Sequence, residues 1–246
     1  CWTTKGSGTD NGYNGGNIRM SAGMVTNCVV AQGHVIHTMD ASIKGALGGN
    51  IYMVGGTVVD CDILDGSIYN VNGAGGGANV MMHNGGRIVR CRISGGCRSS
   101  GASTTYTLES GGSGLYMNGA CTAENSLICN NSGAYGSVAL IGAARLVNCT
   151  IAGNSGNHNG YNGVILRDAN PLVVNCVMFG NGGTAINEWG NSQPSRFLYC
   201  AAPNAPSGTG CFALAGLQAE HFEDDEYRPL PTSSMIDAGA SDLYAT

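Results

Sequence analysis

The sequence is poor in charged residues and in proline, and both shortages limit the structures it can form. Charged residues make up 11% of the 246 positions, against about 25% in an ordinary globular domain, and there are only 6 prolines. Hydrophobic residues still make up 43%, which excludes an intrinsically disordered chain. Turns must therefore be made mostly by the 41 glycines and by asparagine, the residues that adopt positive φ at least cost.

Long apolar runs and clusters of basic residues are also missing. No stretch approaches the roughly 18–20 apolar residues that span a bilayer, so we predict no transmembrane segment. The 11 Lys and Arg residues form no run and the net charge is −5, which makes nucleic acid a poor partner. The chain opens at Cys1-Trp2 without an initiator methionine or a signal peptide, and we interpret it as a processed piece of a longer protein.

One motif with a cysteine near its end recurs along the chain. A clear copy leads from Gly49–Met53 to Val58–Ile63, and the next leads from Asn79–Met82 to Ile88–Ile93. The cysteines that we place at the repeated position are Cys28, Cys61, Cys91, Cys129, Cys149, Cys176 and Cys200. Their spacings of 20 to 38 residues lie within the range of repeat architectures, and insertions at turns account for the variation.

Each copy contains two short patches in which every second residue is apolar. Ile51 and Met53 form the first patch of one copy, and Cys61 and Ile63 form the second. This alternation is typical of strands with one buried face. The sequence therefore predicts an all-β fold, a right-handed parallel β-helix of about seven coils with two or three strands each over residues 1–205. Residues 206–246 are predicted to form an irregular capping segment that continues into a missing region.

The seven repeated cysteines are predicted to form a column of free, buried thiols. Neighbouring coils lie about 4.8 Å apart, whereas a disulfide needs Cβ atoms about 3.5–4.5 Å apart. We predict no metal site and no cofactor, because there is no Cys-x-x-Cys pair and the histidines do not share the cysteine register. Outside the column, Cys97 and Cys121 are proposed to form a disulfide, while the pairing of Cys1 and Cys211 is left open.

The outward positions of the first patch contain no carboxylate, so we assign no catalytic residue. A glycosidase needs two carboxyl groups about 5–9.5 Å apart, and Glu109 and Asp168 are isolated candidates near turns. Pairs of Asp60 with Arg90 and of Asp62 with Arg92, one coil apart, are predicted to stabilise the register. A polar and aromatic strip is the candidate ligand-binding surface, with ordinary surface residues of a sheet as the alternative. The strip consists of Arg19, Tyr52, His83 and Tyr116.

The tail of the chain resembles a known ending. Phe222–Pro231, followed by Ser233-Ser234-Met235-Ile236-Asp237-Ala238-Gly239, is similar to the closing segment of bacterial surface β-helix proteins of the choice-of-anchor and polymorphic outer-membrane type. Ser234 stands where that ending usually has proline, and the Phe-x-x-Asn motif of the polymorphic proteins is not repeated. The resemblance implies an exported protein and carries no chemistry with it.

These observations together predict an extracellular or cell-surface β-helix with a structural or adhesive role. Its expected partners are a glycan, a surface protein or further copies of itself. The alternative is a polysaccharide lyase or glycoside hydrolase whose site lies in the insertion from Gly95 to Gly114.

Overall fold

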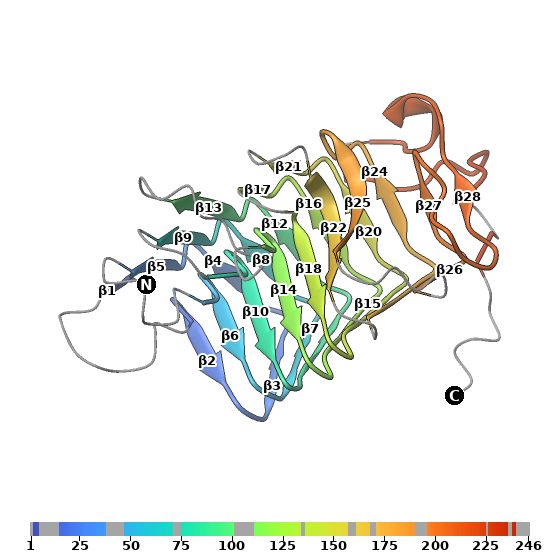
Figure 1. Cartoon of the computed structure of the whole chain (residues 1–246). Coiled ribbons are helices and arrows are strands. Elements are labelled where there is room, and N and C mark those ends of the chain that lie inside the picture. The colour runs from blue at the N-terminus through green and yellow to red at the C-terminus, as the bar shows by residue number, and fades with distance from the viewer. Residues whose placement is uncertain are drawn as a thin grey trace.

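The computed structural model is an elongated solenoid of short parallel strands (Figure 1). It describes residues 2–4, 15–37, 47–70, 75–100, 111–133, 136–156, 161–167, 171–189, 196–224, 226–235 and 238–239. Successive coils add one strand to each of several sheets, and every pairing between named strands is parallel. The predicted parallel β-helix of about seven coils is confirmed.

Three sheets enclose the core. The first contains β2 (Ile18–Met20), β6 (Ile51–Met53), β10 (Val80–His83), β14 (Leu115–Asn118), β18 (Val138–Ile141), β22 (Tyr161–Arg167) and β25 (Thr184–Trp189). The second contains β3 (Met24–Thr26), β7 (Thr57–Val59), β11 (Arg87–Val89), β15 (Thr122–Glu124), β19 (Arg145–Val147), β23 (Leu172–Val174) and β26 (Phe197–Leu198). The third contains β4 (Val29–Ala31), β8 (Asp62–Leu64), β12 (Arg92–Ser94), β16 (Leu127–Cys129), β20 (Thr150–Ala152), β24 (Val177–Phe179), β27 (Ala201–Ala202) and β28 (Phe212–Ala213).

A fourth sheet lies beside this three-sided core. Its strands are β1 (Trp2–Thr4), β5 (His34–His37), β9 (Ser67–Asn70), β13 (Cys97–Ser100), β17 (Ser132–Gly133) and β21 (Ser155–Gly156). Five coils therefore have four strands each, and the expectation of two or three strands was too low. The fourth strands carry mostly serine and other polar residues, so the apolar alternation used to find the others does not mark them.

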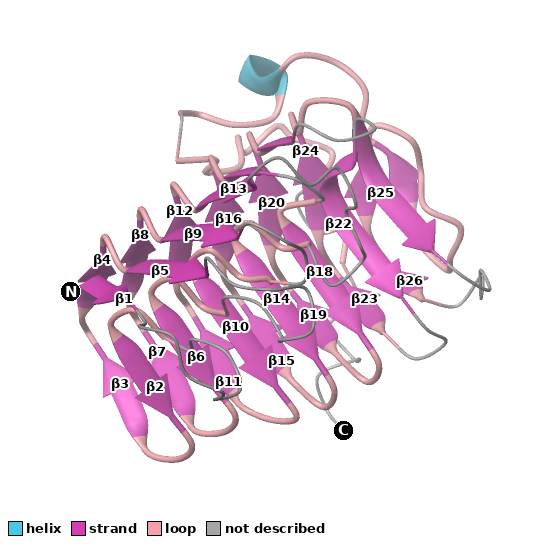
Figure 2. Cartoon of the chain, turned by 60° about the vertical axis from the view of Figure 1, so that its left-hand side comes forward, coloured by secondary structure: helices cyan, strands magenta, loops and turns pink. Residues whose placement is uncertain are grey.

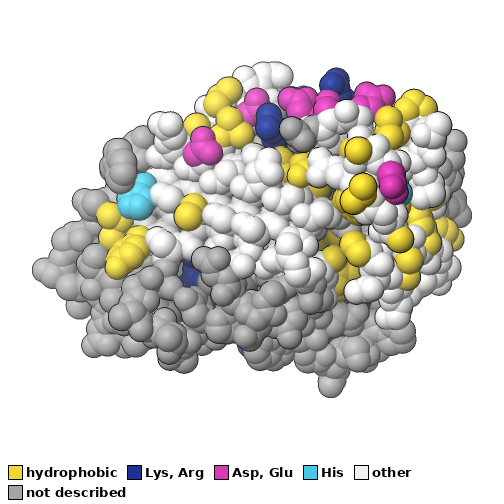
Figure 3. Space-filling view, turned by 90° about the horizontal axis from the view of Figure 1, so that it is seen from above, with side chains coloured by type: hydrophobic (Ala, Val, Ile, Leu, Met, Phe, Trp, Pro, Cys, Tyr) yellow, Lys and Arg dark blue, Asp and Glu magenta, His cyan; other side chains and the backbone are white. Residues whose placement is uncertain are grey.

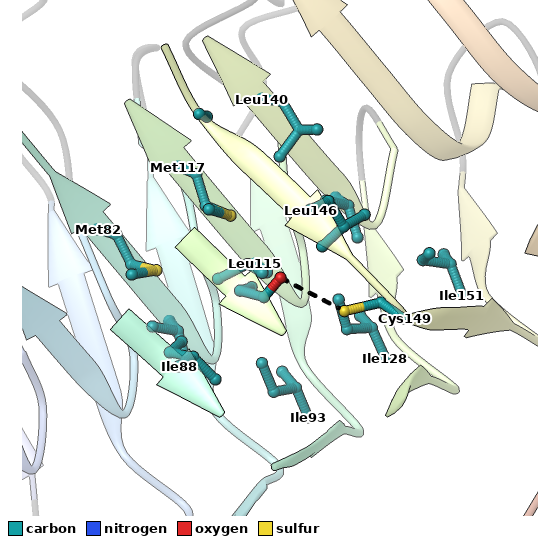
Figure 4. Close-up of a cluster of buried hydrophobic side chains, with 14 of the residues drawn as sticks. Met82, Ile88, Ile93, Leu115, Met117, Ile128, Leu140, Leu146, Cys149 and Ile151 are labelled. Atoms are coloured by element: carbon teal, nitrogen blue, oxygen red, sulfur yellow. Dashed lines mark hydrogen bonds between the residues drawn. The ribbon is translucent and has the colours of Figure 1, made fainter. Parts of the chain in front are cut away.

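The core is a stack of layers to which each coil contributes a few side chains. Met82 and Met117 from the first sheet, Ile88 from the second and Ile93 and Ile128 from the third point into the same interior (Figure 4). All five are fully buried. Burial of such a side chain contributes about 1.5–3 kcal/mol, and since each coil packs only on its neighbours, the coils must stabilise one another.

The cysteine column exists, with one predicted member replaced. Strand register aligns Cys28, Cys61, Cys91, Cys149, Cys176, Cys200 and Cys211, each just before a strand of the third sheet. The fourth coil places Ser126 at this position, because Leu127 pairs with Arg92 and with Thr150. Cys129 lies three residues later and pairs with Ser94, so its placement in the column was wrong. Cys211, left unassigned from the sequence, is the last member.

The column thiols do more than fill space. Cys176 donates to the carbonyl of Val174 at 3.2 Å, and its sulfur accepts from the N–H of Cys149 at 3.4 Å. Ser126 makes the same pair of contacts, donating to Glu124 O at 2.7 Å and accepting from Cys91 N at 3.1 Å. A hydroxyl therefore replaces a thiol there without loss of hydrogen bonds.

A ladder of buried asparagines closes the coils where the third sheet ends and the first begins. Each side-chain amide donates to the side-chain oxygen of the next, over distances of 2.8 to 3.1 Å. The members in order are Asn17, Asn50, Asn79, Asn131, Asn154 and Asn181. Sequence reasoning missed this ladder, because its members occupy two different places in the repeat.

The source of the ladder amide changes between the third and fourth coils. Asn50 and Asn79 precede strands of the first sheet, whereas Asn131 and the two members after it follow strands of the third sheet. Where the third coil meets the fourth, a glycine lies across the corner from each asparagine. A Cβ on Gly96 would lie 2.8 Å from the Asn79 amide nitrogen, and one on Gly114 would lie 2.7 Å from that of Asn131. There is room for one amide per coil, which either side of the corner can supply.

A further column turns the chain just before the strands of the third sheet. The residue before each column cysteine up to Cys200, or before Ser126, has φ between +49° and +53°, and Gly210 before Cys211 has φ +69°. The residues other than Gly210 are Asn27, Asp60, Arg90, Asn125, Asn148, Asn175 and Tyr199. Asn and Asp tolerate this left-handed conformation, which costs other residues about 1–2 kcal/mol.

The C-terminal cover, defined as residues 214–224 and 226–235, folds back over the outer face of the third sheet. Phe222 and Tyr227 pack on Phe179, Ala152 and Cys129 in a second hydrophobic cluster. A short 3-10 turn, η2 (Gln218–Glu220), lies above β20 and β24 (Figure 2). The phenylalanine and tyrosine of the tail motif are therefore packing residues.

Candidate functional site

The predicted ligand-binding strip is mostly buried. Tyr52 and Tyr116 are 9% and 4% exposed and pack with Met81 and two other apolar residues of the first sheet. Backbone at Gly76 passes so close to Tyr116 that a Cβ there would lie 2.4 Å from the ring. Arg19 is exposed with its guanidinium 6.0 Å from the Tyr52 ring centre, and His83 is half-buried. The strip therefore offers solvent two polar side chains and little aromatic surface.

The proposed Cys97–Cys121 disulfide is not present. Cys121 is buried in the core at the corner between β14 and β15, and its thiol donates to Gly85 O at 3.3 Å. Cys97 is exposed at the start of β13 in the fourth sheet, and both thiols are free. The prediction took Cys97 to follow the last strand of its coil, whereas Cys97 begins a fourth strand, β13, that belongs to another sheet.

A groove runs along the corner between the second and third sheets over the first four coils. This corner groove has a volume of about 610 Å³. Buried Cys61 and Cys91 line it, together with exposed Cys28 at its open end. Its remaining lining residues form two rows of one residue per coil, the turn residues Asn27, Asp60, Arg90 and Asn125, and the third-sheet residues Val29, Asp62, Arg92 and Leu127.

One of the two predicted charge pairs forms in the groove. Arg90 donates to both carboxylate oxygens of Asp60, at 2.7 and 2.8 Å, as the register predicted. This hydrogen bonding lowers the pKa of Asp60 and raises the pKa of Arg90. Arg92 instead lies 4.0 Å from Glu226 of the C-terminal cover, and Asp62 makes no ion pair within the described residues. The cover lies outside the coil pattern, so the register could not predict this contact.

Arg90 is held in an unusual backbone conformation. Its φ is +49° at a corner where five of the other six residues are Asn or Asp. The bidentate contact with Asp60 in the preceding coil fixes the plane of the guanidinium, while the side chain keeps 57% of its surface exposed. A fixed and exposed guanidinium is available to a ligand, which favours the groove over the buried strip as the place of binding.

The same corner is covered in the later coils. Met235, Ala238 and Gly239 lie along it near Asn148 and Asn175 and leave a pocket of about 180 Å³. The groove is thus open over the first four coils and bordered by the chain's own tail beyond them. Viewed from above, the described charged side chains gather along one edge of the molecule, and much of that face is uncharged (Figure 3).

The two isolated acids named from the sequence, Glu109 and Asp168, lie outside the described residues. Within the described part, Asp60, Glu124 and Asp224 are each paired with an arginine. No group of three His, Cys, Asp or Glu side chains in that part is arranged to hold a metal ion. The chemistry that the groove offers is hydrogen bonding by amide, carboxylate and guanidinium groups.

Comparisons with known proteins returned no relative. No protein-family model, curated protein or solved structure matches the chain. Among the described residues, no helix has the length and apolar character needed to cross a bilayer.

Proposed function

We propose that this chain is an exported structural or adhesive module that binds a repeating polymer, above all a glycan, at a cell surface or after secretion. The observation that carries the proposal is the repetition of the surface. Each coil presents a side chain at the same position of the corner, so that rows of different residues such as Asn27, Asp60 and Arg90 follow the solenoid axis. A surface with a repeating spacing can contact successive units of a polymer, and shallow contacts then add through multivalency.

The resemblance of the tail to bacterial surface β-helix proteins supports export. In this chain the motif residues Phe222, Tyr227 and Met235 pack against the third sheet and its last coils. The proposed family is that of the choice-of-anchor and polymorphic outer-membrane type.

A glycan array with the whole chain, followed by a reducing-end assay on every glycan that binds, tests the proposal. We expect binding without release of new ends. Release of ends would favour the alternative, a polysaccharide lyase or glycoside hydrolase. Particle size measured by light scattering reports self-association, and a chain that neither binds any glycan nor associates with itself would contradict the proposal.

A further inference from the structure

We propose that the corner groove is the glycan-binding site and that it takes an uncharged oligosaccharide along the solenoid axis. The inference rests on the proposed function and moves the site away from the first-sheet strip. The groove differs from that strip in exposure, because its turn residues Asn27, Asp60, Arg90 and Asn125 are all exposed.

The dimensions suit a short extended ligand. Four coils contribute to the groove, so it extends over three coil spacings, about 14 Å at ~4.8 Å per coil. Each coil supplies one turn residue on one wall and one third-sheet residue on the other. A linear saccharide laid along the axis would therefore meet a new pair of side chains at each coil.

The side chains suit sugar hydroxyls. Arg90 uses Nε and Nη2 on Asp60, and its half-exposed guanidinium leaves N–H groups directed away from that carboxylate. Asp62 offers an exposed carboxylate that forms no ion pair in the described part of the chain. The side-chain oxygen of Asn125 accepts one hydrogen bond among the described residues, from the Asn148 amide at 3.0 Å. Val29, which is 69% exposed, and Leu127 provide apolar contacts for the carbon faces of sugar rings.

The charge balance favours an uncharged ligand. The lining holds two carboxylates, Asp60 and Asp62, and two guanidinium groups, Arg90 and Arg92, which cancel. Of the described charges near the lining, Arg87 and Glu124 pair with each other, and Glu226 lies 4.0 Å from Arg92. A uronic-acid polymer or a nucleic acid would meet no net positive field here.

Isothermal titration of the whole chain with neutral and with uronic-acid oligosaccharides tests the inference. Two groove variants are compared, Arg90→Asn and Asp62→Asn. Arg90→Asn should fold at least as well as the natural chain, because asparagine suits φ +49° better than arginine does. The matched control is Arg87→Asn, which removes another exposed arginine from the same coil. Arg87 makes a bidentate contact with Glu124, and neither residue lines the groove.

We expect the natural chain to bind a neutral oligosaccharide with an affinity that does not change between low and high salt. Each groove variant should weaken binding about tenfold, equal to 1.4 kcal/mol, while the control binds as before and all three keep their urea midpoints. Equal binding by groove and control variants would overturn the site and leave the proposed function standing. Preference for uronic acids would also overturn it. Failure to bind any saccharide overturns the inference, and the proposed function then depends on self-association alone.

Discussion

Replacement of Asn131 by alanine should destabilise the solenoid more than any change on its surface. Asn131 is the first ladder member that follows a strand of the third sheet in the chain, and its side chain is completely buried. Its oxygen accepts from Gly96 N at 2.8 Å and from the Asn79 amide at 3.1 Å. Its nitrogen donates to Ile93 O, Cys129 O and Asn154 Oδ1 at 3.0 to 3.1 Å.

The magnitude follows from the groups left without partners. Alanine would leave the Gly96 N–H and one Asn79 N–H unsatisfied in a buried corner, and each such donor costs about 1–3 kcal/mol. With a smaller contribution from the carbonyls, the total is about 4 kcal/mol, a large share of the 5–15 kcal/mol of a typical domain. Because coils are coupled only to their neighbours, unfolding should also lose cooperativity between the third and fourth coils.

Urea denaturation followed by circular dichroism measures the effect. With an m-value of about 3 kcal/mol/M, 4 kcal/mol lowers the midpoint by about 1.3 M. The control is Asn130→Gly, one residue earlier, where the side chain is exposed and φ is +54°, a conformation that glycine adopts freely. If Asn131→Ala shifts the midpoint no further than this control, the ladder does not stabilise the fold as argued.

Three further predictions concern the thiols and the cover. Cys176→Ser should change the free energy of unfolding by less than about 1 kcal/mol in urea denaturation, because Ser126 makes the equivalent pair of hydrogen bonds in the fourth coil. A loss of about 1–3 kcal/mol, the cost of a buried hydroxyl without a partner, would contradict this. Burial raises the pKa of Cys91 from 9 to about 11, so its contribution to stability should be complete below pH 9 and fall as pH rises to about 11. Titration of unfolding free energy against pH in the natural chain and in Cys91→Ser checks this, since the serine variant should lack that part of the decline. Phe222→Ala should free the C-terminal cover, because the ring lies 5.8 Å from that of Phe179 in a buried cluster where such truncations cost about 3–5 kcal/mol. Hydrogen exchange should then rise in the cover and not in the first three coils. Equal protection of the cover and of these coils in the variant would count against a separable cover.

The coil pattern could be predicted because apolar alternation and a repeated cysteine both follow from a core that is built one layer at a time. The error at Cys129 shows the limit of reading by residue type. Asn125, two positions before Leu127, and Ile128 match the turn and core positions of other coils, so the sequence did contain the signal for Ser126. Choosing the cysteine over the turn asparagine shifted that coil by three residues.

Features that depend on contacts between distant segments could not be predicted in this way. The asparagine ladder changes its position in the repeat, so no fixed spacing connects Asn79 to Asn131. Burial of Tyr52 and Tyr116 depends on chain that crosses the first sheet, and the turn of Arg92 toward Glu226 depends on the cover. In each case the deciding neighbour lies outside the coil pattern from which the prediction was made.

The change in the origin of the ladder amide means that this solenoid is assembled from two interchangeable kinds of coil. Duplication or deletion of a coil within residues 47–100, or within residues 111–156, would join two coils of the same kind and leave the asparagine ladder continuous. A junction between unlike coils is tolerated only where glycine faces the incoming asparagine, as Gly96 and Gly114 do. Solenoids of this type can therefore lengthen by recombination at many points, and an engineer who wishes to extend one needs to match only the kind of coil at the cut.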